Sequence, residues 1–165
     1  MASQHTGDST ADASASAPDL NEAQAIALRY LGRREYAAVE LVRKLQQRDI
    51  EEATAWQAIE ALQAAGLQSD TRFAEAFVRQ RVGSFNGPIK IRAQLRQRGL
   101  GDALIERALG EQDTDWHALA VDWAARKHRG ALDEKQRARL YRGGRSRGFS
   151  HDQIMRAIDR LRDSA

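Results

Sequence analysis

The sequence predicts an all-α protein made of three tandem three-helix repeats. A degenerate pattern of similar residues occurs at 41–59, 91–109 and 140–158, and the copies align on Arg48, Arg98 and Arg147. These arginines are 50 and then 49 residues apart, and a fixed period of this size indicates one small structural unit used three times. The chain has two prolines and no stretch that alternates apolar and polar residues as a strand would, so each unit is expected to be helical.

The repeats are expected to follow a short polar tail. Residues 1–19 are small, polar and aperiodic, so they cannot bury enough surface to offset their ordering entropy, and we expect them to be disordered. The three repeats are assigned to residues 20–68, 69–112 and 113–165. Each of their helices is too short to be stable alone, so its stability must come from packing within its triplet.

The first repeat is expected to open with a capping box. Asp19 and Glu22 are spaced so that each side chain can accept a hydrogen bond from a backbone N–H of the first turn. The three helices are placed at about residues 20–34, 37–48 and 52–65. Gly66 then follows the last of them, where glycine commonly ends a helix, and Leu67 would add an apolar contact.

The second repeat contains the clearest loop of the chain. Ser69 is a good N-cap for its first helix, because a serine hydroxyl can accept a backbone N–H of the first turn. Residues 84–88 are typical of a loop, and Pro88 suits the first turn of the helix that follows. That helix is expected to bury Leu95 and to end near Gly99.

The third repeat has start signals of the same kind. Asp115 is the expected N-cap of its first helix, and the chain is expected to break at Gly130. Ser150 and Gln153 form a second predicted capping box at the start of the last helix.

Composition excludes several classes of protein. The chain has no cysteine, which excludes disulfides, thiol catalysis and cysteine-based zinc sites. No apolar run approaches the roughly 20 residues of a membrane span, and the N-terminus lacks the basic-then-apolar order of a signal peptide. We therefore expect a cytoplasmic protein without membrane contact.

Residues that could carry catalysis or bind a metal are few. His117 and His128 would share a helix face, but eleven residues separate them by roughly 16 Å, too far to bind one metal ion. The chain also lacks an HExxH zinc motif, a glycine-rich phosphate loop and a Gly-x-Ser-x-Gly turn. We therefore expect no catalytic residue, no metal, no cofactor and no enzymatic activity.

Positive charge is concentrated in two stretches. Three of the 23 acidic residues and none of the 26 basic residues lie within residues 1–20. No acidic residue lies between Arg79 and Arg98, and two lie between Arg126 and Arg147. This pattern favours a polyanion, or a protein coated with one, as partner. A solvated helical surface would have the same pattern, so charge alone leaves both interpretations open.

Two arginines of the central repeat are the strongest binding candidates. At 100° per residue, Arg92 and Arg96 form a stripe on the outer side of their helix, while Leu95 and Arg98 fall on its apolar side. The recurring arginines are better explained as structural, because a cation in the last turn of a helix offsets exposed carbonyls or pairs with a neighbouring carboxylate. The predicted binding set is Arg79, Arg81, Lys90, Arg92, Arg96, Arg139, Arg142 and Arg145.

Two further features each admit two interpretations. Tyr36, Phe85 and Tyr141 could stack on nucleobases, as aromatic residues do in single-strand binders, or pack in the core and loops. Gly143 and Gly144 lie between arginines and could cradle a phosphate or break a helix. We favour packing for the aromatic residues and a helix break for the glycines.

The order of motifs carries a family resemblance. RREY-x3-EL-x2-KL at 33–45 is followed by D-x-RFA-x-AF at 70–77, GPIKIRAQLRQRGL at 87–100 and SRGFSHDQI at 146–154. In this order the motifs resemble those of the bacterial RecX family, regulators of the recombinase RecA. The likeness extends over about residues 22–163, nearly all of the chain outside the tail.

The resemblance implies a fold, a partner and an activity. RecX-like repeats would form an elongated, curved array that binds RecA, chiefly as the filament on single-stranded DNA. Such a protein would lodge in the filament groove and suppress ATP hydrolysis, strand exchange and stimulated repressor cleavage, so it would act in DNA repair, recombination and the SOS response. It would act as a monomer and bind nucleic acid alone only weakly. The alternatives are a helix-turn-helix-like DNA-binding module and a helical-repeat adaptor for another acidic protein.

The chain departs from the family pattern at two places. Ala37 stands where a polar helix cap is expected, so that cap should be lost, at a cost of about 1 kcal/mol. Gly143 and Gly144 stand where larger residues are expected, and Gly144 matches Leu45 and Leu95 in the other repeats. We therefore expect the helix around these glycines to be shorter or kinked.

Overall fold

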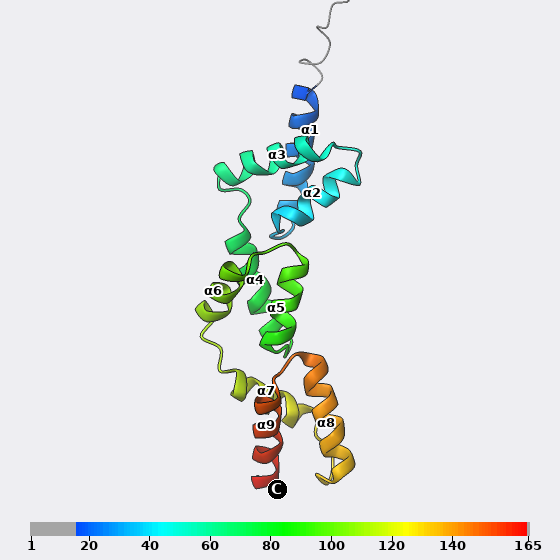
Figure 1. The fold of residues 1–165 in the computed structure, drawn as a ribbon, viewed down its shortest axis with the longest axis vertical. Coiled ribbons are helices and arrows are strands. Elements are labelled where there is room, and N and C mark those ends of the chain that lie inside the picture. Colours follow the sequence, from blue (N-terminus) through cyan, green and yellow to red (C-terminus); the bar gives the residue numbers. More distant parts are fainter. Residues whose placement is uncertain (1–15, 165) are drawn as a thin grey trace, which may run out of the picture. The chain divides into compact units, whose positions relative to one another are not determined.

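The computed structural model describes residues 16–164, and this part of the chain consists of nine α-helices and the turns that connect them (Figure 1). The helices are α1 (Ser16–Leu31), α2 (Ala38–Gln46), α3 (Glu52–Ala64), α4 (Asp70–Gly83), α5 (Pro88–Gln97), α6 (Asp102–Glu111), α7 (Trp116–Lys127), α8 (Glu134–Arg147) and α9 (His151–Asp163). The predicted all-α fold is confirmed. Within the described residues, none of these helices is long and apolar enough to cross a membrane.

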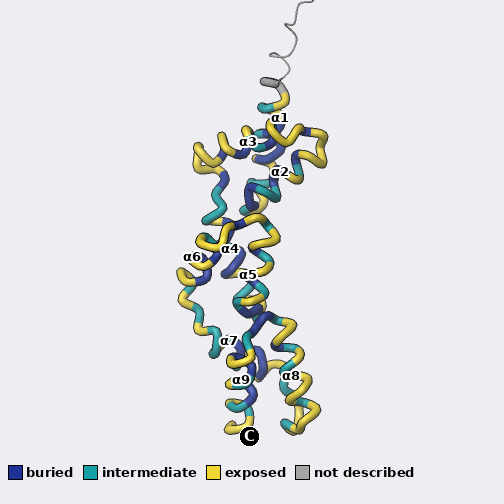
Figure 2. Tube along the Cα trace, viewed as in Figure 1, coloured by how far each residue is buried: buried dark blue, intermediate teal, exposed yellow. Residues whose placement is uncertain are grey.

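The chain divides into two compact units between Gln68 and Ser69. The first unit contains the first triplet, α1–α3, and the second unit contains the second triplet, α4–α6, and the third, α7–α9. In each triplet the buried residues lie where its helices pack against one another (Figure 2). The residues at which one repeat gives way to the next, and the elongated, curved arrangement of the repeats, stay predictions.

The first unit has an apolar core against which two tyrosines pack. Leu41, Leu45 and Ile59 are fully buried among α1, α2 and α3. The rings of Tyr30 and Tyr36 meet edge to face with centroids 5.6 Å apart. Gln68 is the last residue of the unit, and its buried side chain donates a hydrogen bond to the Tyr36 carbonyl at 3.0 Å. This bond connects the end of the unit to its core.

The first helix starts and ends earlier than predicted. It begins at Ser16, so Asp19 lies in its first turn and does not precede it as an N-cap. Pro18 is compatible with this start, because the first N–H groups of a helix have no partner within the helix. The helix ends at Leu31, and Gly32 follows it. Residues 16–19 therefore belong to the fold, whereas the predicted disorder of 1–15 falls outside the described residues.

The other helix-end predictions of the first unit are largely confirmed. Ala37 precedes α2 and offers no side-chain acceptor, so the cap is lost as expected, although its own N–H donates to the Glu40 carboxylate at 3.3 Å. Gly66 has a φ of +72° after α3, as expected of a glycine at a helix end. Leu67 is 49% exposed, and the apolar contact predicted for it stays a prediction.

In the second unit each residue that was predicted to cap or begin a helix is found at the start of that helix. The Ser69 hydroxyl accepts a hydrogen bond from the Arg72 N–H at 3.2 Å, and Pro88 is the first residue of α5. The Asp115 carboxylate caps α7 by accepting from the Ala118 N–H at 2.9 Å. Ser150 and Gln153 form the predicted capping box of α9. These caps satisfy N–H groups that a helix start otherwise leaves unpaired.

The expected shortening of the helix around Gly143 and Gly144 is wrong. Helix α8 is unbroken over 14 residues, whereas α2 has 9 and α5 has 10. A Cβ atom on Gly143 would lie 3.1 Å from the Trp123 ring, and one on Gly144 would lie 2.7 Å from the Ile154 side chain. The space that a leucine occupies in the other repeats is therefore filled here by Trp123 and Ile154 from the neighbouring helices.

A backbone joint connects the second triplet with the third. The Gly87 N–H donates to the Arg147 carbonyl at 2.7 Å, and the Ile89 N–H donates to the Gly148 carbonyl at 3.0 Å. The N-terminus of α5 thus receives its acceptors from the C-terminus of α8. A Cβ atom on Gly87 would overlap the Gly148 carbonyl, so side chains are excluded where the backbones meet. We call these contacts the glycine joint.

Replacing Gly148 by alanine should destabilise the second unit more than the matched change at Gly130. Gly148 and Gly130 have φ values of +89° and +73°, and alanine in this left-handed region costs about 1–2 kcal/mol. At Gly148 the new methyl group would also overlap the backbone of Lys90, whereas nothing lies within 4 Å at Gly130. Overpacking of this kind adds about 1–3 kcal/mol.

Urea denaturation followed by circular dichroism measures both variants. Gly148→Ala should lower the free energy of unfolding by at least about 1 kcal/mol more than Gly130→Ala. Equal losses at the two positions would contradict a tight joint.

Candidate functional site

The two strongest sequence candidates are already engaged in ion pairs. The guanidinium of Arg92 binds the Glu106 carboxylate through two nitrogens, with the Nη2–Oε2 distance at 3.2 Å. The Nε of Arg96 donates to Asp102 at 2.7 Å. Asp102 and Glu106 are one turn apart on α6, so this helix neutralises the arginine stripe of α5. The outer stripe exists as predicted, but its charges are paired within the second triplet.

This pairing shifts the pKa values of the groups that form it. The hydrogen bond from Arg92 lowers the pKa of Glu106 below its ordinary value, and the positive charges of Arg92 and Arg96 act in the same direction. The hydrogen bond to Glu106 raises the pKa of Arg92, and the negative charges of Glu106 and Asp102 add to this shift. Both shifts stabilise the charged forms, so the pair persists at neutral pH.

Two more arginines of the second triplet serve packing. The guanidinium groups of Arg81 and Arg98 lie 4.9 Å and 4.7 Å from the centroid of the buried Phe77 ring. These are cation–π distances, and they hold both side chains against the core. Arg98 also donates to the Gln94 carbonyl at 3.2 Å in the last turn of α5. The structural role predicted for Arg98 is confirmed, and Arg81 is held in the same packing.

The other two recurring arginines differ from each other. Arg147 donates to the Ser84 carbonyl at 2.9 Å and so ties the end of α8 to the loop after α4, as its predicted structural role requires. The Arg48 side chain makes no hydrogen bond or ion pair with residues 16–164, and Arg48 borders a cavity of about 280 Å³ together with Arg29 and Arg33. For Arg48 the prediction of a carbonyl or carboxylate contact is therefore wrong.

The remaining candidates are free of ion pairs within the described chain. They are Arg79, Lys90, Arg139, Arg142 and Arg145. The last three lie three residues apart on α8 and are exposed, whereas Leu140 and Gly144 turn toward the core. The backbone of Lys90 packs against Gly148 in the glycine joint.

Sequence reasoning missed three cations next to this set. Lys127, Lys135 and Arg137 are exposed and have no partner among residues 16–164. A usable signal was present, because no acidic residue lies between Lys135 and Arg147. With Lys135, the exposed side of α8 carries unpaired positive charge along most of its length. We call this surface the α8 cationic face and define it by Lys135, Arg139, Arg142 and Arg145.

The three aromatic residues pack, as favoured by the sequence. Tyr36 is buried in the first core. Phe85 packs against the third core with the Arg126 guanidinium 4.9 Å from its ring centroid. The Tyr141 hydroxyl lies 3.0 Å from Nδ1 of His151. Each ring therefore has a structural partner.

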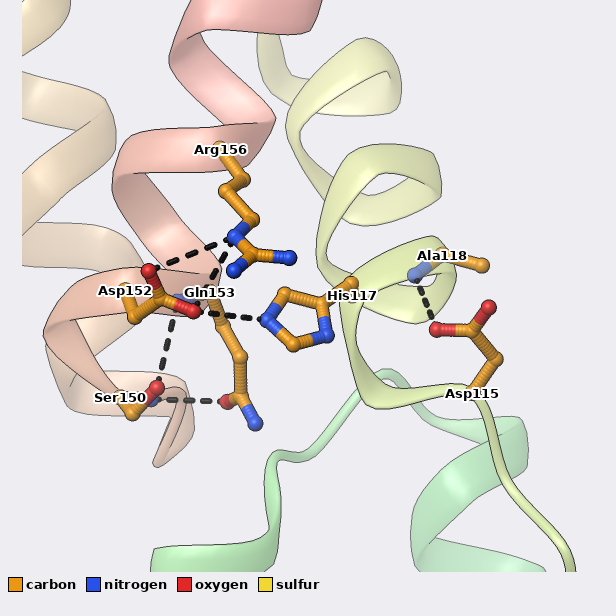
Figure 3. Close-up of polar contacts among 7 residues, drawn as sticks. All are labelled: Asp115, His117, Ala118, Ser150, Asp152, Gln153 and Arg156. Atoms are coloured by element: carbon orange, nitrogen blue, oxygen red, sulfur yellow. Dashed lines mark hydrogen bonds and ion pairs between the residues drawn. The ribbon is translucent and has the colours of Figure 1, made fainter.

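A polar cluster links the starts of α7 and α9 (Figure 3). His117 of α7 lies 2.9 Å from the Asp152 carboxylate, which also pairs with Arg156 at 3.2 Å. Because an ionised carboxylate can only accept, Nε2–H of His117 donates this hydrogen bond. It lowers the pKa of Asp152, and the charge of Arg156 lowers it further. The cluster holds α7 on α9, and residues 16–164 contain no group of three or more acidic or histidine side chains placed to hold a metal ion.

Glu106→Gln should remove stability that depends on pH. Because the folded pKa of Glu106 lies below the ordinary value near 4.3, the pair stabilises the fold above that value and loses its effect as pH falls through the folded pKa. The Glu106 side chain is 55% exposed, so wild type should exceed the variant by up to about 1 kcal/mol at neutral pH, and the difference should vanish toward about pH 2.

Urea midpoints measured across this pH range test the pair. The control is Glu60→Gln, because Glu60 is exposed on α3 and has no ion pair among the described residues. A wild-type advantage that grows as pH falls would contradict the pairing.

His117→Ala should raise the pKa of Asp152 more than Arg156→Ala does. The hydrogen bond from His117 is the larger cause of the lowered pKa, and the charge of Arg156 is the smaller one. Titration of the Asp152 carboxyl carbon by NMR measures both shifts. If Arg156→Ala had the larger effect, the arrangement in Figure 3 would be wrong.

Comparisons with known proteins match this architecture throughout. Three family descriptions match in order: RecX, first three-helix domain, at residues 23–62; RecX, second three-helix domain, at 69–109; and RecX, third three-helix domain, at 113–158. "Regulatory protein RecX" of Chromohalobacter salexigens is 39% identical over 133 residues, which cover 80% of this chain and 88% of the relative. The protein of the same name from Pseudomonas putida is 41% identical over 134 residues, 80% of this chain and 86% of the relative.

Solved structures give the same result. The crystal structure of RecX from Lactobacillus salivarius superposes with a TM-score of 0.74 at 27% identity, covering 88% of this chain and 97% of that one. A crystal structure of regulatory protein RecX superposes with a TM-score of 0.75, also at 27% identity, covering 88% of this chain and 74% of that one. Three matching domains in the same order and close relatives over most of the length establish that the chain belongs to the RecX family of regulatory proteins.

Proposed function

We propose that the chain is a non-enzymatic negative modulator of the recombinase RecA. It binds the RecA filament on single-stranded DNA and inhibits ATP hydrolysis, strand exchange and co-protease activity, so it acts in the cytoplasm during DNA repair and the SOS response. The observation that carries this proposal is the presence of all three RecX three-helix domains in order. It binds as a monomer, and its contact with nucleic acid alone is weak.

The α8 cationic face supports a nucleoprotein as the partner. Its four lysine and arginine side chains are exposed and have no ion pair among residues 16–164, so approach of an anion does not have to break an existing contact. Complementary charge of this kind speeds encounter and sets orientation. We therefore place the primary filament contact on α8, with Arg79 and Lys90 as further contacts, and give the paired Arg92 and Arg96 a structural role.

The shifted ionisable groups support a binding role over a catalytic one. Perturbed pKa values mark catalytic acids and bases when no structural partner accounts for them. Here the pKa shifts of Arg92, Glu106 and Asp152 are each explained by hydrogen bonds and charges of neighbouring side chains. These groups therefore serve packing, and the function proposed for the chain rests on its surface.

An ATP hydrolysis assay tests the proposal. Purified chain is added to RecA, single-stranded DNA and ATP, and ATP turnover should fall at or below equimolar protein. Arg142→Ala with Arg145→Ala should weaken inhibition about tenfold or more, because hydrogen bonds to charged groups contribute about 1.5–3 kcal/mol each. The matched control is Arg43→Ala with Arg160→Ala, which removes two exposed, unpaired arginines from α2 and α9 of the described chain.

The alternatives predict other outcomes in the same assay series. No fall in ATP turnover with wild-type protein would contradict the proposal. Tight binding to a preferred duplex sequence would instead support a helix-turn-helix-like module, since sequence is recognised by contacts to base edges. Binding to an acidic protein without any dependence on nucleic acid would support an adaptor. Equal loss of inhibition in the two double variants would remove α8 from the interface.

A further inference from the structure

A basic cavity lies between α7 and α8 in the third triplet. Its volume is about 240 Å³, and the residues that line it include Lys127, Arg139 and Arg147. Trp123, Leu140 and Gly143 form the apolar part of the wall. No acidic residue is among the described residues that line it. The cavity therefore combines three positive charges with an aromatic wall and holds no neutralising carboxylate.

The indole of Trp123 gives this cavity an unsatisfied donor. Trp123 is 5% exposed, and its Nε1 has no hydrogen-bond partner within the described chain. An indole N–H can only donate, and a buried donor without an acceptor costs about 1–3 kcal/mol. The ring atom Cζ3 approaches the Gly144 position, while Cζ2, on the N–H side of the ring, approaches Gly143, which lines the cavity. Cζ2 is bonded to the ring carbon that carries Nε1, so this edge of the indole lies beside the wall residue Gly143.

The three cations can reach an anion without giving up their other contacts. Lys127 and Arg139 have no partner among residues 16–164. Arg147 uses one terminal nitrogen to hold the Ser84 carbonyl, and a guanidinium has five N–H donors in all. An arginine fork matches the geometry of phosphate oxygens, and charge-assisted hydrogen bonds of this type are the strong ones.

The volume of the cavity and the donors in its wall indicate which kind of ligand it can hold. A single water needs only about 10–15 Å³ of such space, so a cavity of about 240 Å³ admits a larger group. A compact anion with several acceptor oxygens would meet the indole N–H and the cations together. Of the common biological anions, a phosphate group best combines the oxygen number with the charge required by three cations.

We propose that the cavity between α7 and α8 binds a phosphate group, with Lys127, Arg139 and Arg147 neutralising its charge and the Trp123 indole N–H donating to one oxygen. This site goes beyond the modulator role, because it exists on the free chain and requires no RecA. The phosphate can belong to a nucleotide or to the backbone of a nucleic acid, and both offer the same oxygens to the cavity.

The indole N–H signal of Trp123 tests the site directly. The chain has three tryptophans, so a ¹⁵N-labelled sample gives three indole signals, and Trp123→Phe assigns the one of interest. If that variant does not fold, Trp56→Phe and Trp116→Phe assign it by elimination. Adding inorganic phosphate at constant ionic strength should move the Trp123 signal in a saturable way and leave the other two in place.

Matched variants separate the site from general attraction. Arg139→Ala should weaken the phosphate titration about tenfold, as loss of one charge-assisted hydrogen bond does. Arg137→Ala removes another exposed arginine of α8 that does not line the cavity, and it should titrate like wild type. Titrations with thymidine monophosphate and with a short oligodeoxythymidylate then show which source of phosphate binds more tightly.

Three outcomes would overturn the proposal. The first is a Trp123 signal that does not respond to phosphate, as expected if water alone fills the cavity. The second is an equal response to chloride, which would show an adventitious ion only. The third is an equal effect of Arg139→Ala and Arg137→Ala. None of these outcomes depends on RecA, so failure of this site and failure of the modulator role can be told apart.

Discussion

The link between the second and third triplets depends on the glycine joint between α5 and α8. Every α-helix leaves N–H groups unpaired at its start and carbonyls unpaired at its end, with partial charges of opposite sign. At Gly87 and Gly148 these two ends satisfy each other, and the Arg147 side chain adds a hydrogen bond to the Ser84 carbonyl. A side chain at either glycine would overlap the opposing backbone, so the joint requires glycine at both positions.

The joint places α8 in a defined position on the third triplet. With its C-terminal end held at the joint, α8 turns Leu140 and Gly144 toward the core and exposes its arginines. Trp123 fills the room that Gly143 and Gly144 leave free, and the ring packs on Phe149 with centroids 5.9 Å apart. The candidate binding face and residues that line the cavity therefore occur on the same helix.

Local sequence signals predicted most of the fold, and long-range contacts account for the failures. The caps at Ser69, Asp115 and Ser150 lie within three residues of the N–H groups they satisfy, so the sequence alone reveals them. The continuity of α8 could not be predicted, because Trp123 fills the gap from another helix. Helical geometry predicted that Arg92 points outward. It could not predict the pairing with Glu106, which lies fourteen residues further on in another helix.

We propose that this RecX-family chain regulates by presenting the α8 cationic face to a nucleoprotein filament. The most direct measurement is an electron cryo-microscopy structure of the chain bound to RecA on single-stranded DNA with nucleotide. We predict that α8 faces the filament, with Arg142 and Arg145 within hydrogen-bond distance of acidic or phosphate oxygens. A bound chain whose α8 faces solvent, while the paired stripe of α5 contacts the filament, would contradict this account.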